Sequence, residues 1–356
     1  MNKEKTFVTV TGVIIGVIAV ALVMLGNPAN MGFCIACFLR DTAGALKLHQ
    51  AAVVQYMRPE IIGLVLGASI MAFSKKELVA RAGSNPFVRF VLGFFVMVGA
   101  LVFLGCPLRM MLRIGAGDLN AIIGLVGFVL GIGCGIIALN QGFSLDRAYK
   151  VTASEAYAFP VMQIVFLVVL LAVPSIIMFS AEGPGSMHAP VIISLGAGLI
   201  VGGLCQRTRF CTVAGIRDSF MFKDFTLLFG FIALIAACIV MNLIVGKFNL
   251  GFESQPIAHT DAVWNLLGML LVGFASVLLG GCPLRQLILS GEGNIDSVIT
   301  VIGMTVGAAF CHNFGLASSG EGSTPNGHIA VIIGLIVVAA IAVINISSNK
   351  KKAGAR

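Results

Sequence analysis

The chain has 356 residues, of which 58% are hydrophobic and 11% charged, and its mean hydropathy is +1.02. These values exclude an ordinary soluble globular domain, whose apolar fraction is lower and whose charged fraction is about twice as large. The formal net charge is +8. No stretch is left that could build a sizeable soluble domain, so we expect no nucleic-acid partner and look for function within the lipid bilayer.

The chain contains about ten apolar runs long enough to cross a membrane, because a spanning helix needs roughly 20 residues. The first run ends in Gly26-Asn-Pro without a small-residue cleavage site, and we interpret it as a span and not as a signal peptide. The sequence therefore predicts an all-α polytopic membrane protein. The runs begin near Phe7, Pro59, Phe87, Leu119, Phe159, Pro190, Phe225, Ala262, Ile295 and His328.

Lysine and arginine are unevenly distributed among the connecting segments, and this distribution predicts orientation, since basic loops stay in the cytoplasm. Segments 182–188 and 312–328 carry no Lys or Arg, and segment 247–261 carries one, so we expect these three outside. With ten spans, both termini are then cytoplasmic. The basic residues expected in the cytoplasm are Lys3, Lys5, Lys75, Lys76, Arg81, Arg89, Arg147, Lys150 and Lys350–Lys352.

Two motifs occur twice in the same order. FCIACFLRD at Phe33–Asp41 corresponds to FCTVAGIRD at Phe210–Asp218, and GCPLR at Gly105–Arg109 recurs at Gly281–Arg285. Repetition at a fixed offset indicates an internal duplication. The chain is expected to consist of two related halves within one membrane domain.

The predicted halves are residues 1–180 and 181–356, with five long spans in each. An odd number of spans makes the second half enter the membrane from the opposite side, which gives two inverted-topology repeats, an arrangement typical of transporters. The alignment continues through Gly127 and Gly131 against Gly303 and Gly307. Such small-residue faces allow close helix approach, either within the chain or between chains.

The GCPLR motif predicts a helix break. Gly105 suits the end of one helix and Pro107 suits the first turn of the next. The following stretches, Leu108–Ile114 and Leu284–Leu289, are too short to span and end at glycines, so we expect short re-entrant helices. Broken backbone at membrane depth is tolerated only where it is buried in protein or lines a wet cavity.

Cysteines stand at these breaks. Cys106 and Cys282 are expected near the N-termini of the short helices, where free N–H groups favour anions. Cys34 and Cys211 repeat in the other motif. Because packing alone does not require the same thiol at symmetric positions, these four residues are candidates for lining a substrate path.

Arg109 and Arg285 follow in the first turn of the short helices, where a cation opposes the helix dipole. A central arginine costs about 2.5 to 3.5 kcal/mol to insert, so a negative partner is expected. A bound or permeating anion is one such partner, which would make these residues anion-stabilising. Asp118, Asp296 or a lipid headgroup is the structural alternative.

The other motif ends in adjacent Arg-Asp pairs, Arg40 with Asp41 and Arg217 with Asp218. We interpret them as structural charge clamps that hold the two halves together. Because neighbours along a helix do not face each other, we expect Arg40 and Asp41 to hold different partners.

The nine cysteines include one Cys34-x-x-Cys37 pair, whose second thiol is replaced by Ala214 in the repeat. A zinc site requires four ligands, and a redox motif occurs in a different context, so we expect no metal, no cofactor and no catalytic residue. Cys134 and Cys238 lie in apolar runs without polar neighbours and are interpreted as packing residues.

The duplicated halves with GCPLR twice and the FCIACFLRD/FCTVAGIRD pair resemble the YeeE/YedE family of bacterial inner-membrane sulfur transporters, and the compact length resembles its selenium-associated YedE branch. The resemblance covers essentially the whole chain. It implies a transporter, not an enzyme, in which a thiosulfate-like ion or a selenium compound passes along cysteines. The residues that match are Cys34, Cys106 and Cys282, with Cys211 less certain.

The resemblance also implies location in the inner membrane and a cytosolic TusA-like sulfur carrier protein as receiver. Two other functions remain open from the residues alone. A membrane thiol-disulfide oxidoreductase would need two cysteines within bonding distance. A plain anion channel would depend on Arg109 and Arg285 and not on thiols.

Overall fold

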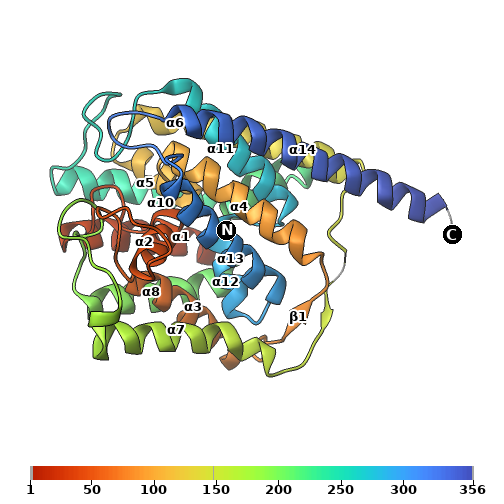
Figure 1. Cartoon of the computed structure of the whole chain (residues 1–356), viewed down its shortest axis with the longest axis horizontal. Coiled ribbons are helices and arrows are strands. Elements are labelled where there is room, and N and C mark those ends of the chain that lie inside the picture. The colour runs from red at the N-terminus through yellow and green to blue at the C-terminus, as the bar shows by residue number, and fades with distance from the viewer. Residues whose placement is uncertain (1–2, 147, 355–356) are drawn as a thin grey trace.

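The computed structural model describes residues 3–146 and 148–354, so Arg147, one of the predicted cytoplasmic residues, lies outside the described residues. Almost all regular structure is helical (Figure 1). The elements are α1 Lys3–Met24, α2 Ile35–Ala45, α3 Pro59–Ser74, β1 Arg81–Ala82, α4 Pro86–Phe103, α5 Pro107–Gly115, α6 Leu119–Asn140, β2 Tyr149–Lys150, α7 Glu155–Ala172, a 3₁₀ turn Pro174–Ile176, α8 Val191–Thr208, α9 Thr212–Met221, α10 Thr226–Ile244, α11 Ala262–Leu278, α12 Pro283–Gly291, α13 Ile295–Asn313 and α14 Pro325–Gly354.

The ten predicted runs each coincide with a helix. Within the described residues, nine segments are long and apolar enough to cross a membrane, with α4–α5, α8–α9 and α11–α12 each counted as one broken segment. The tenth, α3, is apolar but has 16 residues. The predicted fold class is confirmed: the chain is an all-α, multi-pass membrane protein.

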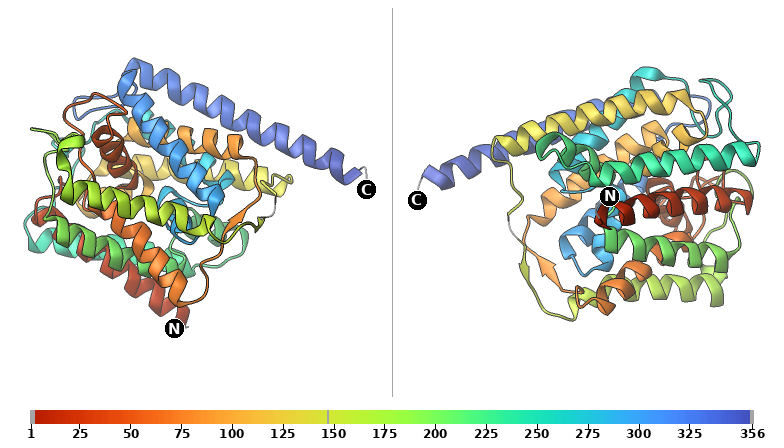
Figure 2. Two further views of the ribbon diagram at one scale, coloured as in Figure 1. Left: turned by 60° about the horizontal axis from the view of Figure 1, so that its bottom comes forward. Right: turned by 180° about the vertical axis from the view of Figure 1, so that it is seen from behind.

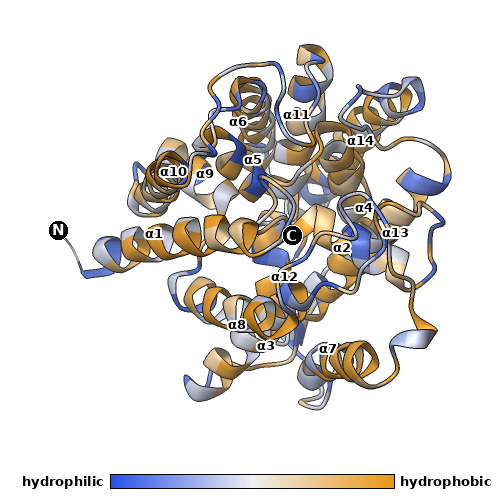
Figure 3. Cartoon of the chain, turned by 90° about the vertical axis from the view of Figure 1, so that its left-hand side faces the viewer, coloured by the Kyte–Doolittle hydropathy of each residue, from blue (hydrophilic) through white to orange (hydrophobic). Residues whose placement is uncertain are grey.

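Four short helices complete the bundle: α2, α5, α9 and α12. Seen end-on in Figure 3, the mostly hydrophobic long helices surround α2, α5 and α12, which carry hydrophilic positions near the centre. The predicted break before α5 is present, because Leu104 ends α4 in the left-handed region with φ of 63°. A side chain rarely adopts this conformation, so the break is a built feature of the backbone.

The long helices pair mainly across the predicted halves. Helix α1 packs on α10 and α3 packs on α8, while α4 packs on α13 and α6 on α11. Figure 2 shows these helices side by side from two directions, with α14 extending beyond them toward the C-terminus. Residues 1–180 and 181–356 therefore interleave and share one core.

The glycine faces noted in the sequence lie at these contacts. Added Cβ atoms at Gly127 and Gly131 would meet the carbonyls of Leu266 and Leu270 on α11 at 2.0 and 2.1 Å. Gly303 and Gly307 pack in the same way on Phe90 and Phe94 of α4. The two faces serve close packing within this chain.

We predict that Gly131→Ala destabilises the protein, because its methyl group would collide with the rigid backbone of α11. Overpacking of this kind costs about 1 to 3 kcal/mol. Gly133→Ala is the matched control, since nothing lies within 4 Å of the added carbon. Thermal unfolding in detergent should show a lower midpoint for Gly131→Ala alone, and equal midpoints would contradict the packing described.

The connecting segments gather at two ends. Strand β1 pairs with β2, with Arg81 opposite Lys150, which joins two predicted cytoplasmic segments. At the other end, Arg58 donates to the carbonyl of Pro184, and Asp261 accepts a hydrogen bond from Ser323. The three segments expected outside lie at this end, so the grouping follows the charge pattern, while the side that faces the cytoplasm stays a prediction.

Helices α5 and α12 end at opposite ends of the bundle. Asp118, just after α5, forms an isolated bridge with Gly251 in the α10–α11 loop. Asn294, just after α12, forms the corresponding bridge with Arg81 in the α3–α4 loop. The two GCPLR helices thus run toward opposite faces.

Candidate functional site

Each short helix begins at a cysteine. The N-cap residues of α2, α5, α9 and α12 are Cys34, Cys106, Cys211 and Cys282, all of them buried. These are the four cysteines singled out in the sequence, and the structure gathers them into two clusters.

The first cluster lies in residues 1–180. The sulfurs of Cys34 and Cys37 are 2.8 Å apart, and the N–H of Cys37 donates to Cys34 Sγ at 3.3 Å. The thiol of Cys106 lies near that of Cys34. Sequence reasoning left Cys37 out because the repeat has alanine there, yet the spacing of three residues on a helix brings it beside Cys34.

The second cluster lies in residues 181–356 and repeats this arrangement. The N–H of Cys282 donates to Cys211 Sγ at 3.4 Å, and the N–H of Ala214 donates to the same sulfur at 3.5 Å. The thiols of Cys211 and Cys282 lie near each other, and Cys205 of α8 lies close to Cys282. Helix α12 packs against α2, so the elements that carry the two clusters are in contact.

Arg109 lies beside the first cluster and is fully buried. Its guanidinium donates to the carbonyls of Asn30 at 3.2 Å, Ile257 at 3.0 Å and Leu104, and to Cys37 Sγ at 3.5 Å. Among the residues that the structure describes, no carboxylate lies within ion-pairing distance of Arg109. Its charge is therefore held by carbonyl dipoles and not by a counter-ion of the protein.

Asp118, the counter-ion considered for Arg109, is bonded to Arg113 at 2.6 Å. Arg113 also donates to the carbonyl of Phe103 at 2.9 Å. Arg113 and Asp118 therefore neutralise each other, and Asp118 is not the counter-ion of Arg109.

Arg285 differs from its repeat partner because it pairs with Glu292 at 2.8 Å. Asp296 instead accepts hydrogen bonds from Ser84, at 2.5 Å from its hydroxyl. Glu292 was not predicted from the sequence. The signal was its spacing, since positions seven apart on a helix share one face.

The adjacent Arg-Asp pairs form direct bonds, so the expectation of different partners for Arg40 and Asp41 was wrong. Arg40 Nε donates to Asp41 at 2.8 Å, and Arg217 Nε donates to Asp218 at 2.8 Å. The long arginine side chain can fold back along the helix to its neighbour. Asp41 also bonds Arg58 at 2.7 Å.

Arg58 connects the two halves and was not singled out from the sequence. Its guanidinium donates to the carbonyls of Pro184 at 2.8 Å and Met187 at 3.0 Å, in addition to Asp41. The first Arg-Asp pair therefore contacts residues 181–356 through Arg58. Arg217 and Asp218 are more exposed, at 22% each, while Asp41 is fully buried.

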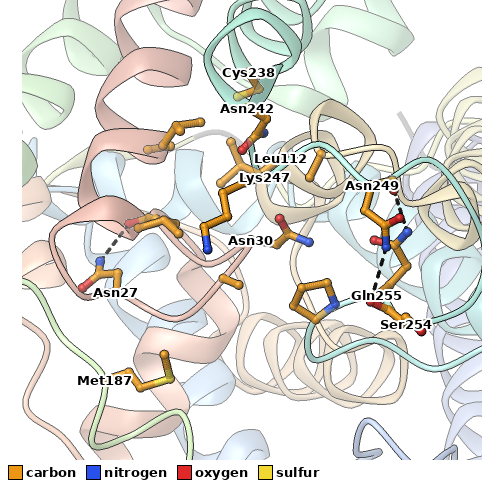
Figure 4. Close-up of a pocket in the computed structure, with 17 residues that line it drawn as sticks. Asn27, Asn30, Leu112, Met187, Cys238, Asn242, Lys247, Asn249, Ser254 and Gln255 are labelled. Carbon is orange, nitrogen blue, oxygen red and sulfur yellow. Dashed lines mark hydrogen bonds between the residues drawn. The ribbon is translucent and has the colours of Figure 1, made fainter. Parts of the chain in front are cut away.

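A pocket of about 230 Å³ opens at the end where the segments predicted to be external gather. Figure 4 shows the Lys247 side chain reaching into it among Asn27, Asn30 and Asn242. Among the described residues, no acidic side chain lines it, and Asn30, whose carbonyl accepts from Arg109, forms part of its wall. Cys238, interpreted as a packing residue, also borders it. We call this pocket the outer pocket.

A second pocket, of about 410 Å³, opens beside the second cysteine cluster and is called the inner pocket. Hydrogen bonds from Thr226 lower the pKa of Asp224 below its ordinary value, so this acid stays ionised at neutral pH. Both Cys211 and Arg285 line the pocket. Its charged residues are Arg207, Arg209, Arg217, Arg285, Glu4, Asp218 and Asp224.

Within the described part of the chain, no group of three or more His, Cys, Asp or Glu side chains is arranged to hold a metal ion. Each cysteine cluster consists of three thiols, and no carboxylate or imidazole of the described residues is hydrogen-bonded to any of them. Their chemistry is that of S–H and N–H donors at helix N-termini.

Residues 207–351 match a protein family described as sulphur transport. This stretch contains α9 to α13 and the second cysteine cluster except Cys205. The chain is also 30% identical over 118 residues to the thiosulfate transporter TsuA of Escherichia coli (strain K12). That alignment covers 32% of this chain and 32% of TsuA, so it spans about a third of the relative's length. Both matches concern sulfur, and neither bears on selenium.

Proposed function

We propose that the protein is a transporter that takes up a small sulfur-containing anion such as thiosulfate across a bacterial inner membrane. Both termini lie in the cytoplasm, and residues 1–180 and 181–356 form two inverted-topology repeats. The observation that carries the proposal is that two cysteine clusters lie at the N-termini of short helices. The first lies beside Arg109, which bonds the outer-pocket residue Asn30, and the second borders the inner pocket through Cys211.

The path begins in the outer pocket, where Lys247 and neutral amides attract an anion. Arg109 lies behind Asn30 and carries a positive charge without a protein carboxylate. The anion then meets Cys34 and Cys106, followed by Cys211 and Cys282. Cys211 borders the inner pocket, from which the anion leaves.

The chemistry of the clusters suits a sulfur anion. A thiol donates a weak hydrogen bond through a polarisable sulfur, and free N–H groups at a helix N-terminus favour negative charge. A series of weak sites binds well enough for entry and loosely enough for release, as conduction requires. A strong cage of charged ligands would retain the ion.

Uptake of a dianion also has an electrical cost. Moving one charge across 100 mV costs about 2.3 kcal/mol, so a doubly charged anion entering a negative interior requires about 4.6 kcal/mol from another source. The sequence resemblance adds two finer proposals: a selenium compound as alternative cargo, and a TusA-like carrier protein as receiver at the inner pocket.

The test is uptake of radiolabelled thiosulfate and of selenite by cells that lack their own transporters. We expect thiosulfate accumulation with this protein and none with an empty vector, and excess unlabelled thiosulfate should suppress it. Accumulation of selenite in the same cells would extend the cargo to selenium. If neither ion enters above the vector background, the proposed cargo class is wrong.

A membrane thiol-disulfide oxidoreductase is the second candidate, because the sulfurs of Cys34 and Cys37 are only 2.8 Å apart. It predicts a mixed disulfide between Cys34 and a partner thiol when Cys37→Ser is expressed. Thiosulfate transport without such a mixed disulfide would support the transporter over the oxidoreductase. A plain anion channel would keep its conductance in Cys→Ser variants and lose it in Arg109→Gln.

A further inference from the structure

Glu60 is a buried carboxyl group without a cationic partner. It lies in the first turn of α3 and is fully buried. Its Oε1 accepts hydrogen bonds from Asn27 Nδ2 at 2.8 Å and Ser194 Oγ at 2.9 Å. Its Oε2 is also buried and accepts none from the described residues. No described Lys, Arg or His lies within ion-pairing distance of it.

The surrounding groups fix this arrangement. Asn27 Oδ1 accepts the N–H of Ala189 at 2.8 Å, which turns the amide nitrogen of Asn27 toward Glu60. Asn27 precedes α2, Ser194 lies on α8, and Glu60 lies on α3. Three elements therefore converge on one carboxyl group and satisfy one of its two oxygens.

The charged and titratable neighbours do not neutralise it. Arg58 is engaged by Asp41 and by two carbonyls. The ring of Tyr56 stacks on that of His188, with ring centroids 4.3 Å apart. Burial is the main cause that raises the pKa of Tyr56, and the negative charge of the nearby Glu60 is the second cause. Lys247 lines the outer pocket, as Asn27 does, and is not within ion-pairing distance of Glu60. A buried carboxylate is costly unless a cation accompanies it, although the N-terminus of α3 offsets part of that cost.

Glu60 is also close to the entry of the path. Asn27, which donates to it, lines the outer pocket (Figure 4). One hydrogen-bonded residue, Asn27, therefore links the carboxyl group of Glu60 to this pocket. Ionisable residues within membrane segments mark ion pathways and proton relays in transport proteins.

We propose that Glu60 binds a monovalent cation, a proton or a sodium ion, that enters together with the anion. This inference rests on the proposed uptake function. Co-entry of positive charge reduces the electrical cost of moving a dianion into a negative interior. It also gives a role to a buried acid that has no counterpart in the second half, where α10 begins Thr226-Leu227.

The test uses the full chain in proteoliposomes with the membrane potential clamped. Wild type, Glu60→Gln and Glu182→Gln are compared for thiosulfate uptake driven by an inward proton gradient or an inward sodium gradient. Glu182 is the control, because it is an exposed acid in the segment that precedes α8. Counterflow, the exchange of labelled for unlabelled thiosulfate without any cation gradient, is measured in parallel.

We expect one gradient to drive accumulation in wild type and in Glu182→Gln. In Glu60→Gln, gradient-driven accumulation should be at least tenfold lower than in wild type. Its counterflow should stay within about twofold of the wild-type rate. The gradient that works identifies the cation. Gradient-driven accumulation by Glu60→Gln at the wild-type level would overturn the inference, as would indifference of the wild type to both gradients. Absence of counterflow in wild type would instead overturn the proposed uptake function.

Discussion

Thiosulfate uptake is expected to fall at least tenfold in Cys106→Ala and in Cys282→Ala, with the protein still folded and inserted. Each change removes the N-cap thiol of a short helix from one cluster. Loss of a hydrogen bond to a charged group costs about 1.5 to 3 kcal/mol, which corresponds to roughly tenfold or more in rate or affinity. The measurement is initial uptake at low thiosulfate concentration, normalised to the amount of protein in the membrane.

Cys134→Ala is the matched control for this pair, because Cys134 is a free, exposed cysteine on α6 away from both clusters. It should transport at the wild-type rate. Cys311→Ala provides a buried control outside the clusters. Normal uptake by well-expressed Cys106→Ala would remove the cysteine path from the mechanism.

Asp41→Ala is expected to cost far more stability than Asp218→Ala, although the two residues occupy equivalent positions in the repeated motif. Asp41 is fully buried and bonds both Arg40 and Arg58, so its loss leaves two buried cations without a carboxylate. Breaking a buried pair in this way costs about 3 to 5 kcal/mol. Asp218 has 22% of its side chain exposed and pairs with an equally exposed Arg217, and such pairs contribute about 1 kcal/mol or less.

Thermal unfolding in detergent, together with the yield of inserted protein, measures this difference. Asp41→Ala should show a strongly lowered midpoint or a loss of folded protein, and Asp218→Ala should stay close to wild type. Equal effects would contradict the unequal burial and bonding of the two aspartates.

Much of the fold could be predicted from the sequence, because bilayer thickness imposes helix length and apolar composition. Each of the ten runs corresponds to a helix, and α5 and α12 begin at the prolines of the two motifs. The left-handed residue that ends α4 is Leu104, and not Gly105 as the glycine preference predicts. The pairing of α6 with α11 and of α4 with α13 could not be predicted. Small-residue faces indicate close approach but do not identify the partner.

Of the candidate site, the residues with repeat symmetry could be predicted, and those without it were missed. The four N-cap cysteines were predicted because they form two pairs, and each pair occupies the same motif position in the two halves. Cys37, Glu292 and Glu60 each lack a repeat counterpart, so symmetry gave no signal for them. The Arg40–Asp41 bond was missed because spacing along a helix describes Cβ directions and not the reach of an arginine side chain.

The two repeat-related arginines have acquired unlike electrostatic settings. Arg109 has no carboxylate within reach in the described chain, whereas Arg285 is bonded to Glu292. Under the proposed function, the path therefore binds anions more tightly near Arg109 than near Arg285. The half-saturating concentration should then be lower for anion offered at the Arg109 side than at the Arg285 side. Gradients still set the direction of net flux. The anion concentration needed for half-maximal flux, however, should differ between the two sides of the membrane.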